Sequence, residues 1–158
     1  MAERSWASFY LGDGLFGLEN FYIREVNRST GFTTVDLAPP FVRGLLNLRG
    51  QIVTVLDLRV RLGLERTTLT NQSRCIVLKS WDEVKETPVG RFLGENQVVD
   101  TLGLLVDRMG DIIQTPPEGI EPAPANVGEI DNRFIDGVVK LPECLLVVLR
   151  LQEVLGGG

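Results

Sequence analysis

The feature that most constrains this sequence is an internal repeat. Residues 41–63 align without a gap on residues 134–156, and eight of these 23 positions are identical. The identical pairs are Phe41/Phe134, Gly44/Gly137, Leu48/Leu141, Val55/Val148, Leu56/Leu149, Leu58/Leu151, Leu62/Leu155 and Gly63/Gly156. A weaker repeat aligns Gly17-Leu18 with Gly103-Leu104, followed by Ile23 with Met109, Glu25 with Asp111 and Val26 with Ile112. Because a repeated pattern marks a structural unit that occurs twice, we expect two related halves.

The spacing of apolar residues predicts an all-β fold. Short runs rich in β-branched and aromatic residues alternate with turn signals, and few segments predict helices. We expect strands at residues 6–11, 15–18, 32–37, 52–56, 74–79, 101–106, 111–114, 134–139 and 145–149, short helices at 58–62 and 150–155, and either structure at 21–26. The polar segment 80–99 predicts a long connection, and the proline-rich segment 115–127 predicts an irregular surface crossing. Many short strands favour small barrels.

Composition excludes several classes of function. The 16 basic and 21 acidic residues give a net charge of −5, which disfavours general nucleic-acid binding. The chain has no histidine, so histidine-dependent catalysis and histidine-ligated metals are excluded, and the four close ligands of a structural zinc site are absent. We expect Cys75 and Cys144 to be buried thiols. With no signal peptide or membrane span predicted, we expect a cytoplasmic protein without direct membrane insertion.

One glycine motif raises the alternative of a nucleotide-binding enzyme. Residues 12–17 match G-x-G-x-x-G, a strand precedes them, and Asp36 lies about 20 residues further on, as the dinucleotide fingerprint requires. The residues after Gly14 are apolar, however, and no further strand–helix–strand units follow. We therefore expect a β-hairpin with its turn at Asp13-Gly14. Carboxylates are scattered and no serine has an activating partner, so we expect neither catalysis nor a cofactor.

The polar residues of the first repeat copy are the best candidates for a functional surface. Residues 41–66 hold five arginines against two acids, a local charge of +3. Five polar or glycine positions are not kept in the second copy: Asn47, Arg49, Gly50, Asp57 and Arg59 align with Lys140, Pro142, Glu143, Arg150 and Gln152. The module can therefore fold without them, which predicts a recognition face on the first half only. The alternative is that Arg49, Arg59 and Arg61 only keep a surface soluble.

These motifs resemble the CheW-like domain family of bacterial chemotaxis adaptors. The residues that carry the resemblance are Asn47-Leu48-Arg49-Gly50 with the preceding Phe41-Val42-Arg43-Gly44, an apolar strand, and Asp57-Leu58-Arg59. Residues 17–26, 103–107, 134–138 and 149–155 resemble other segments of the family, so the resemblance covers nearly the whole chain.

The resemblance implies a single CheW-like domain over residues 1–158. This all-β fold has two five-stranded SH3-like β-barrel subdomains and a few short helices. We expect the first barrel at about 17–72, with contributions from the C-terminal segment. The second is expected at about 73–149 plus the N-terminal strand, with an interleaved boundary.

The resemblance also implies a non-enzymatic adaptor. It would couple the cytoplasmic tips of methyl-accepting chemoreceptors to the regulatory domain of the histidine kinase CheA, as a monomer that assembles into receptor arrays. The positions that match the receptor-binding groove are Ile23, Glu25, Arg49, Gly103, Met109 and Ile112. Arg43 and Gly44 match the kinase-binding region. Arg49 either contacts a receptor carboxylate or fastens the barrels through Glu25.

The chain departs from the family pattern in three places. The connection at residues 80–99 is longer than the usual tight turn, Thr54 stands where proline is common, and Asn20-Phe21-Tyr22 is more aromatic than usual. These departures leave open a CheW-like scaffold in a different chemosensory pathway, such as one that controls surface motility, development or a second messenger.

Overall fold

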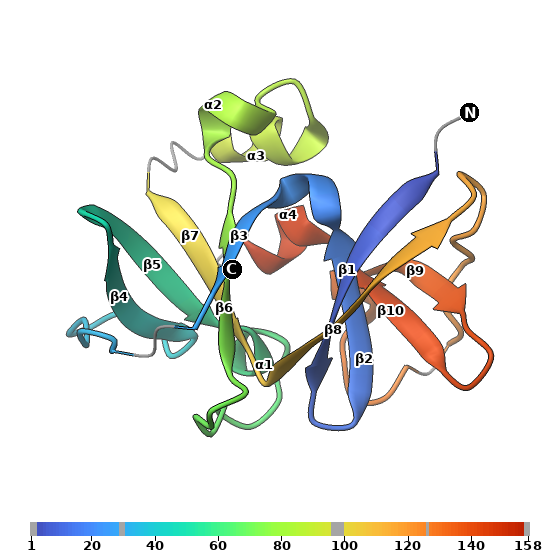
Figure 1. The fold of residues 1–158 in the computed structure, drawn as a ribbon, viewed down its shortest axis with the longest axis horizontal. Coiled ribbons are helices and arrows are strands. Elements are labelled where there is room, and N and C mark those ends of the chain that lie inside the picture. The colour runs from blue at the N-terminus through green and yellow to red at the C-terminus, as the bar shows by residue number, and fades with distance from the viewer. Residues whose placement is uncertain (1–2, 29–30, 96–99, 126, 157–158) are drawn as a thin grey trace.

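Two five-stranded β-sheets make up the protein, with short helices at their junction (Figure 1). The computed structural model describes residues 3–28, 31–95, 100–125 and 127–156. The elements are β1 (Arg4–Leu11), β2 (Gly14–Glu19), η1 (Asn20–Tyr22), β3 (Ile23–Asn27), β4 (Val42–Leu48), β5 (Gln51–Asp57), α1 (Leu58–Arg61), β6 (Arg74–Leu78), α2 (Trp81–Val84), α3 (Pro88–Glu95), β7 (Thr101–Val106), β8 (Arg108–Thr115), η2 (Asn132–Phe134), β9 (Ile135–Lys140), β10 (Leu145–Leu149) and α4 (Leu151–Val154). The all-β prediction is confirmed.

The two sheets have matching strand orders. Sheet A is ordered β8-β1-β2-β10-β9 and sheet B is ordered β3-β6-β7-β5-β4. In each sheet one parallel pair, β2 with β10 or β7 with β5, joins strands from different halves of the sequence. The edge strands of each sheet are not paired with each other among the described residues, so the SH3-like barrels stay open.

The sequence halves exchange strands, and this corrects the expected subdomain boundaries. Strands β1 and β2 leave the first half to join β8, β9 and β10 in sheet A, whereas β6 and β7 leave the second half to join β3, β4 and β5 in sheet B. The second barrel therefore takes β1 and β2 from the N-terminus, and the first barrel takes residues 74–106 rather than a C-terminal segment. The exchange binds both sheets into one unit.

The long repeat corresponds to two copies of one strand–strand–helix unit. The unit β4-β5-α1 in sheet B matches β9-β10-α4 in sheet A. Phe41 accepts a hydrogen bond from the Asp57 N–H, and Phe134 accepts one from the Arg150 N–H, both at 2.7 Å. These four residues occupy equivalent repeat positions, so the alignment of residues 41–63 with 134–156 reproduces backbone contacts as well as burial.

The repeated glycines let a second chain segment cross each unit. At Gly44 the crossing residue is Thr33, whose backbone exchanges two 2.8 Å hydrogen bonds with Leu45. At Gly137 it is Glu121, which exchanges two 2.8 Å hydrogen bonds with Val138. A Cβ on either glycine would lie 2.6 Å from the carbonyl oxygen of the crossing residue. Both positions therefore require glycine for space.

A shared apolar core fills the junction of the sheets. It includes Phe9, Leu18, Leu104 and Leu149, together with Val84 and Val89 from α2 and α3. Smaller clusters fill the inside of each sheet, around Val53 and Leu105 in sheet B and around Trp6 and Leu146 in sheet A. Burial of these side chains is the main stabilising contribution, because each removes apolar surface from water.

Two expectations for connecting segments were wrong, and the structure resolves a third segment that the sequence left open. Residues 32–37 form no strand, only the isolated bridge at Thr33, because the segment crosses sheet B at Gly44. The 80–99 connection carries α2 and α3, and residues 96–99 lie outside the described residues. Residues 21–26 divide into η1 and β3, which settles the ambiguity.

The two cysteines differ, contrary to the expectation that both are buried. Cys75 is fully buried in sheet B, whereas Cys144 is exposed between β9 and β10. Burial raises the pKa of the Cys75 thiol to about 12. We expect iodoacetamide at pH 8 to alkylate Cys144 in the folded protein and to leave Cys75 unmodified until denaturant is added, because the thiolate is the nucleophile. Peptide mass spectrometry reports both sites, and modification of Cys75 under native conditions would contradict the buried placement.

Candidate interaction surface

The Asn47–Gly50 motif forms the hairpin turn between β4 and β5. Arg49 and Gly50 are its two central residues, with φ of 52° and 86°. Two successive positive φ angles suit the right-handed twist of the strands, and glycine adopts them without strain. The Asn47 side chain accepts a 2.9 Å hydrogen bond from the Gly50 N–H. Asn47 and Gly50 therefore shape the turn, which projects Arg49 outward.

Arg49 forms an ion pair with Glu25 of β3, within sheet B. The Arg49 hydrogen bond holds the pKa of the Glu25 carboxyl below its usual value. The Arg49 side chain nevertheless remains 71% exposed. Exposed ion pairs contribute about 0–1 kcal/mol to stability, so this pair orients Arg49 more than it fastens the fold. Because both partners belong to sheet B, the pair does not connect the two barrels.

Asp57 is buried within a polar cluster that closes the first repeat unit. Its side chain is 1% exposed and lies 2.9 Å from the Arg43 guanidinium. It also accepts hydrogen bonds from the Thr67 N–H at 3.0 Å and the Thr67 hydroxyl at 2.8 Å, and it caps α1 through Val60. Arg43 donates a further 2.9 Å bond to the Thr67 carbonyl. Arg43 and Asp57 thus hold the loop after α1.

Two glycines of the predicted sites lie in the interior. A Cβ at Gly103 would approach the Cys75 sulfur to 2.5 Å and Val53 to 3.1 Å. Gly103 is therefore packed against Cys75 and Val53 within sheet B, and Gly44 lies beneath Thr33. Close packing alone requires glycine at both positions.

Arg59 lies at the end of the molecule that holds α1 and the β1–β2 turn. Its guanidinium donates to the Asp107 carboxylate and to the Glu65 carbonyl, both at 2.8 Å. Asp107 also accepts a 2.6 Å hydrogen bond from the Gly12 N–H. These contacts tie α1 to the start of β8, so Arg59 does not share a surface with Arg49.

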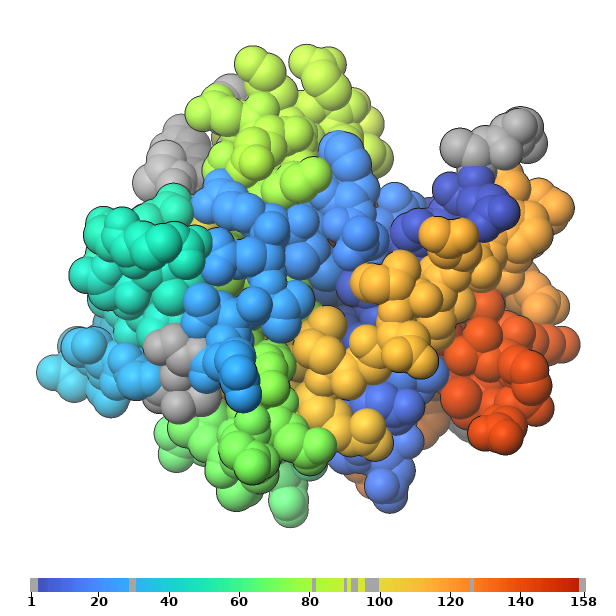
Figure 2. All heavy atoms as spheres, in the orientation of Figure 1, coloured from blue at the N-terminus to red at the C-terminus, as the bar shows by residue number. Residues whose placement is uncertain are grey.

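The remaining predicted residues lie on a face that we call the junction face, formed by the exposed side chains of β3 and β8. Figure 2 shows β3 in blue and β8 in gold on this face. Ile23 and Met109 pack partly into the shared core. Ile112 is 54% exposed and Val26 is also exposed. Exposed apolar surface on a soluble protein marks candidate interaction sites, so this face is a candidate docking surface.

Sequence reasoning missed Arg24, which links β3 to the inserted helices. Its guanidinium donates to the Glu83 carboxylate of α2 at 2.5 Å and to Gln51 at 3.2 Å. The hydrogen bond from Arg24, with further ones from Ser80, lowers the pKa of Glu83 to about 2. The sequence signal that could have indicated the helix beside Arg24 is the Ser80-x-x-Glu83 capping box, which marks a helix start.

Arg61 is a second missed residue, because the sequence offered only a surface role for it. It is buried and donates to the carbonyls of Val154 at 2.7 Å and Glu153 at 2.9 Å, at the end of α4. Its guanidinium lies 5.1 Å from the Phe41 ring centroid and 5.0 Å from that of Phe134. Arg61 therefore joins the two repeat units, and burial lowers its pKa.

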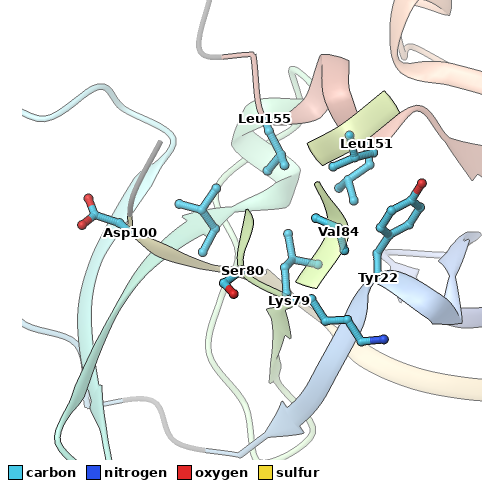
Figure 3. A pocket seen from close by; sticks show the side chains of 10 residues that line it. Tyr22, Lys79, Ser80, Val84, Asp100, Leu151 and Leu155 are labelled. Carbon is cyan, nitrogen blue, oxygen red and sulfur yellow. The ribbon is translucent and has the colours of Figure 1, made fainter. Parts of the chain in front are cut away.

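The inserted helices cover a small apolar pocket beside α4. Figure 3 shows Val84, Leu151 and Leu155 around it, with Tyr22 and Lys79 at its side. The enclosed space is about 10 Å³, close to the smallest cavity that holds one water. This volume is too small for an organic ligand, so the pocket belongs to the packing of α2 and α3 on the core.

No group of three or more cysteine, aspartate or glutamate side chains in the described residues could hold a metal ion. Gly12–Gly17 forms the β1–β2 hairpin, with its turn at Gly12-Asp13, so the dinucleotide reading of that motif is wrong. No helix in the described part of the chain is long and apolar enough to cross a membrane. Fold and surface together define a module of two five-stranded, SH3-like β-sheets.

Comparisons with known proteins identify the family. The model of the CheW-like domain matches residues 5–157. The chemotaxis protein CheW of Treponema pallidum is 27% identical over 146 residues, which cover 92% of this chain and 78% of that protein. CheW of Rhizobium meliloti is 28% identical over 151 residues, covering 96% and 86%. The crystal structure of the scaffolding protein TtCheW from Thermoanaerobacter tengcongensis has a TM-score of 0.77 and 27% identity, covering 98% of this chain and 88% of that one.

The chain belongs to the CheW-like domain family of chemotaxis adaptors. Members of this family are non-catalytic scaffolds, so the chain is an adaptor rather than an enzyme. The resemblance drawn from the sequence motifs is confirmed over nearly the whole chain.

Proposed function

We propose that this protein couples the cytoplasmic tips of methyl-accepting chemoreceptors to the regulatory domain of the histidine kinase CheA. The observation that carries the proposal is the combination, on one side of sheet B and across to β8, of an outward Arg49 and exposed apolar side chains. A helical receptor tip presents apolar residues at i, i+3 and i+4, which suits a surface that bears Ile23, Met109 and Ile112. Methionine adapts to irregular partners.

Arg49 supplies the charged contact in this proposal. The turn holds its backbone, and Glu25 holds its side chain close to β3 while most of the guanidinium stays in water. A receptor carboxylate can accept hydrogen bonds from the exposed nitrogens of this planar fork without displacing Glu25. The kinase contact is proposed for the β4–β5 side, where Ile52 is exposed beside the turn. Arg43 and Gly44 support that surface from inside.

The substitution Arg49→Ala separates binding from folding. We expect receptor affinity to fall about tenfold, because a charge-assisted contact is lost, while stability changes by about 0–1 kcal/mol. Isothermal titration with a soluble receptor tip and thermal unfolding give the two readings.

Lys140→Ala is the matched control. Its side chain is also 71% exposed and also lies in an ion pair, with Glu121 on sheet A. Receptor binding should not change in this variant. Equal loss of affinity in both variants would show a general charge effect, and unfolding of Arg49→Ala would remove the argument for recognition. A pull-down with CheA regulatory domains from flagellar and other chemosensory systems identifies the pathway.

A further inference from the structure

The strand connections at the two ends of the molecule differ, although the two sheets have matching strand orders. The β6–β7 connection in sheet B carries α2 and α3, whose Val84 and Val89 pack into the core beside α4. The corresponding β1–β2 connection in sheet A is the two-residue turn Gly12-Asp13. Among the described residues, the α1 end, at the bottom of Figure 1, carries no inserted helices of this kind. A hollow of about 310 Å³ lies there.

Three arginines from separate segments line this hollow. They are Arg59 from α1, Arg66 from the loop after α1, and Arg108 from β8. Two carboxylates, Glu65 and Asp107, also line it, so the formal balance is +1 in a chain whose net charge is −5. The Asp107 carboxylate already accepts hydrogen bonds from Arg59 and from the Gly12 N–H.

Two of these arginines keep unused hydrogen-bonding capacity. Within the described residues, no ion pair joins Arg66 or Arg108 to a carboxylate. The Arg108 guanidinium lies 3.6 Å from the Tyr10 ring centroid, and this stacking holds the fork without using its N–H donors. Arg59 uses its Nε and one terminal nitrogen.

The loop that carries Arg66 is fixed in place. Thr67, the next residue, is buried and binds Asp57 through both its N–H and its hydroxyl. Thr68 and Thr70 line the same hollow from the other side of this anchor. The Thr70 N–H in turn donates a 2.9 Å hydrogen bond to Ser73. A fixed backbone lowers the entropy lost on binding, which favours a site over a mobile charged loop.

We propose that the hollow at the α1 end binds the phosphate group of a small polyphosphate ligand. Guanidinium forks donate bidentate hydrogen bonds to phosphate oxygens, and threonine hydroxyls add neutral donors. The site is separate from the junction face and does not depend on the proposed receptor coupling. The site also differs from a dinucleotide-binding site at the G-x-G-x-x-G motif of residues 12–17, because Gly14 and Gly17 of that motif face the side chains of Phe16 and Leu146.

Titration with inorganic pyrophosphate at constant ionic strength tests the proposal. We expect saturable binding in NMR or calorimetry, with affinity about tenfold weaker in Arg66→Gln and in Arg108→Gln. Arg91→Gln removes the same charge from exposed α3 at the other end and should bind as the parent does. Adenosine triphosphate forms a second arm: affinity equal to that of pyrophosphate indicates that only phosphate is read, and higher affinity indicates a nucleotide.

Three outcomes would overturn the proposal. They are the absence of saturable binding, equal affinity in the parent and both site variants, and an equal loss in Arg91→Gln. Circular dichroism of each variant confirms that the charge change has not altered the fold, since Arg66 is an exposed loop residue.

Discussion

Alanine at Gly44 or at Gly137 is expected to destabilise the protein by about 1–3 kcal/mol, with the larger loss at Gly44, whose φ of 153° is a backbone conformation that side chains rarely adopt. Each new Cβ would lie 2.6 Å from a backbone oxygen, of Thr33 or of Glu121. Neither oxygen can move freely, because each crossing residue exchanges two 2.8 Å hydrogen bonds with the strand. A backbone contact cannot be relieved by rotating a side chain, so the bridge must open or the strand must shift.

Thermal unfolding measures the effect. For a chain of this size, 1 kcal/mol corresponds to about 2–4 °C, so a fall in melting temperature of several degrees is expected. Gly31→Ala is the control, because a Cβ there meets no atom within 4 Å, and its stability should change by less than about 0.5 kcal/mol. An unchanged melting temperature for Gly44→Ala would mean that the crossing segment does not rest on the strand as described.

The repeat predicted the paired units because their burial is local. Phe41, Leu48, Leu58 and their partners 93 residues later follow one apolar pattern, and burial depends mainly on that pattern. Strand partners could not be predicted in the same way. The parallel pairing of β2 with β10 joins distant segments, and nothing within Gly14–Glu19 specifies which sheet it enters.

The inserted helices were missed for a different reason. Within the polar segment 80–99, Pro88, Gly90 and Gly94 disfavour a helix, since proline and glycine are poor helix formers. Pro88 is the first residue of α3, however, where its missing N–H has no intrahelical partner to lose. Packing of Val84 and Val89 into the shared core supplies the stability that local propensity lacks.

The polar residues of the two repeat copies differ position by position, and this difference hides an ion pair that both copies contain. Asp57 aligns with Arg150, which suggested that the fold has no need of a carboxylate there. Its partner Arg43 aligns with Asp136, and Arg150 pairs with Asp136 at 3.6 Å. The ion pair is therefore present in both copies with its charges reversed. Taken as a pair, positions 43 and 57 and their equivalents 136 and 150 indicate a contact within each repeat unit.

Substitution of Asp57 by alanine is accordingly expected to destabilise the fold by about 3–5 kcal/mol, because it leaves a buried charge without its partner. The Arg43 side chain is only 11% exposed, and Thr67 would lose two acceptors in the interior. Urea unfolding should show a lower midpoint. Asp57→Asn keeps one carbonyl acceptor and should retain part of the stability.

Arg150→Ala is the matched variant, since it removes the equivalent residue of the charge-reversed pair. Both side chains of this pair are well exposed, 39% for Arg150 and 48% for Asp136, so the expected change is about 0–1 kcal/mol. The ion pair should therefore stabilise the first repeat copy strongly and the second hardly at all, because burial of Arg43 and Asp57 removes the screening by water. If Asp57→Ala instead kept full stability and lost only kinase or receptor binding, Asp57 would be a recognition residue, and its burial against Thr67 would have no structural consequence.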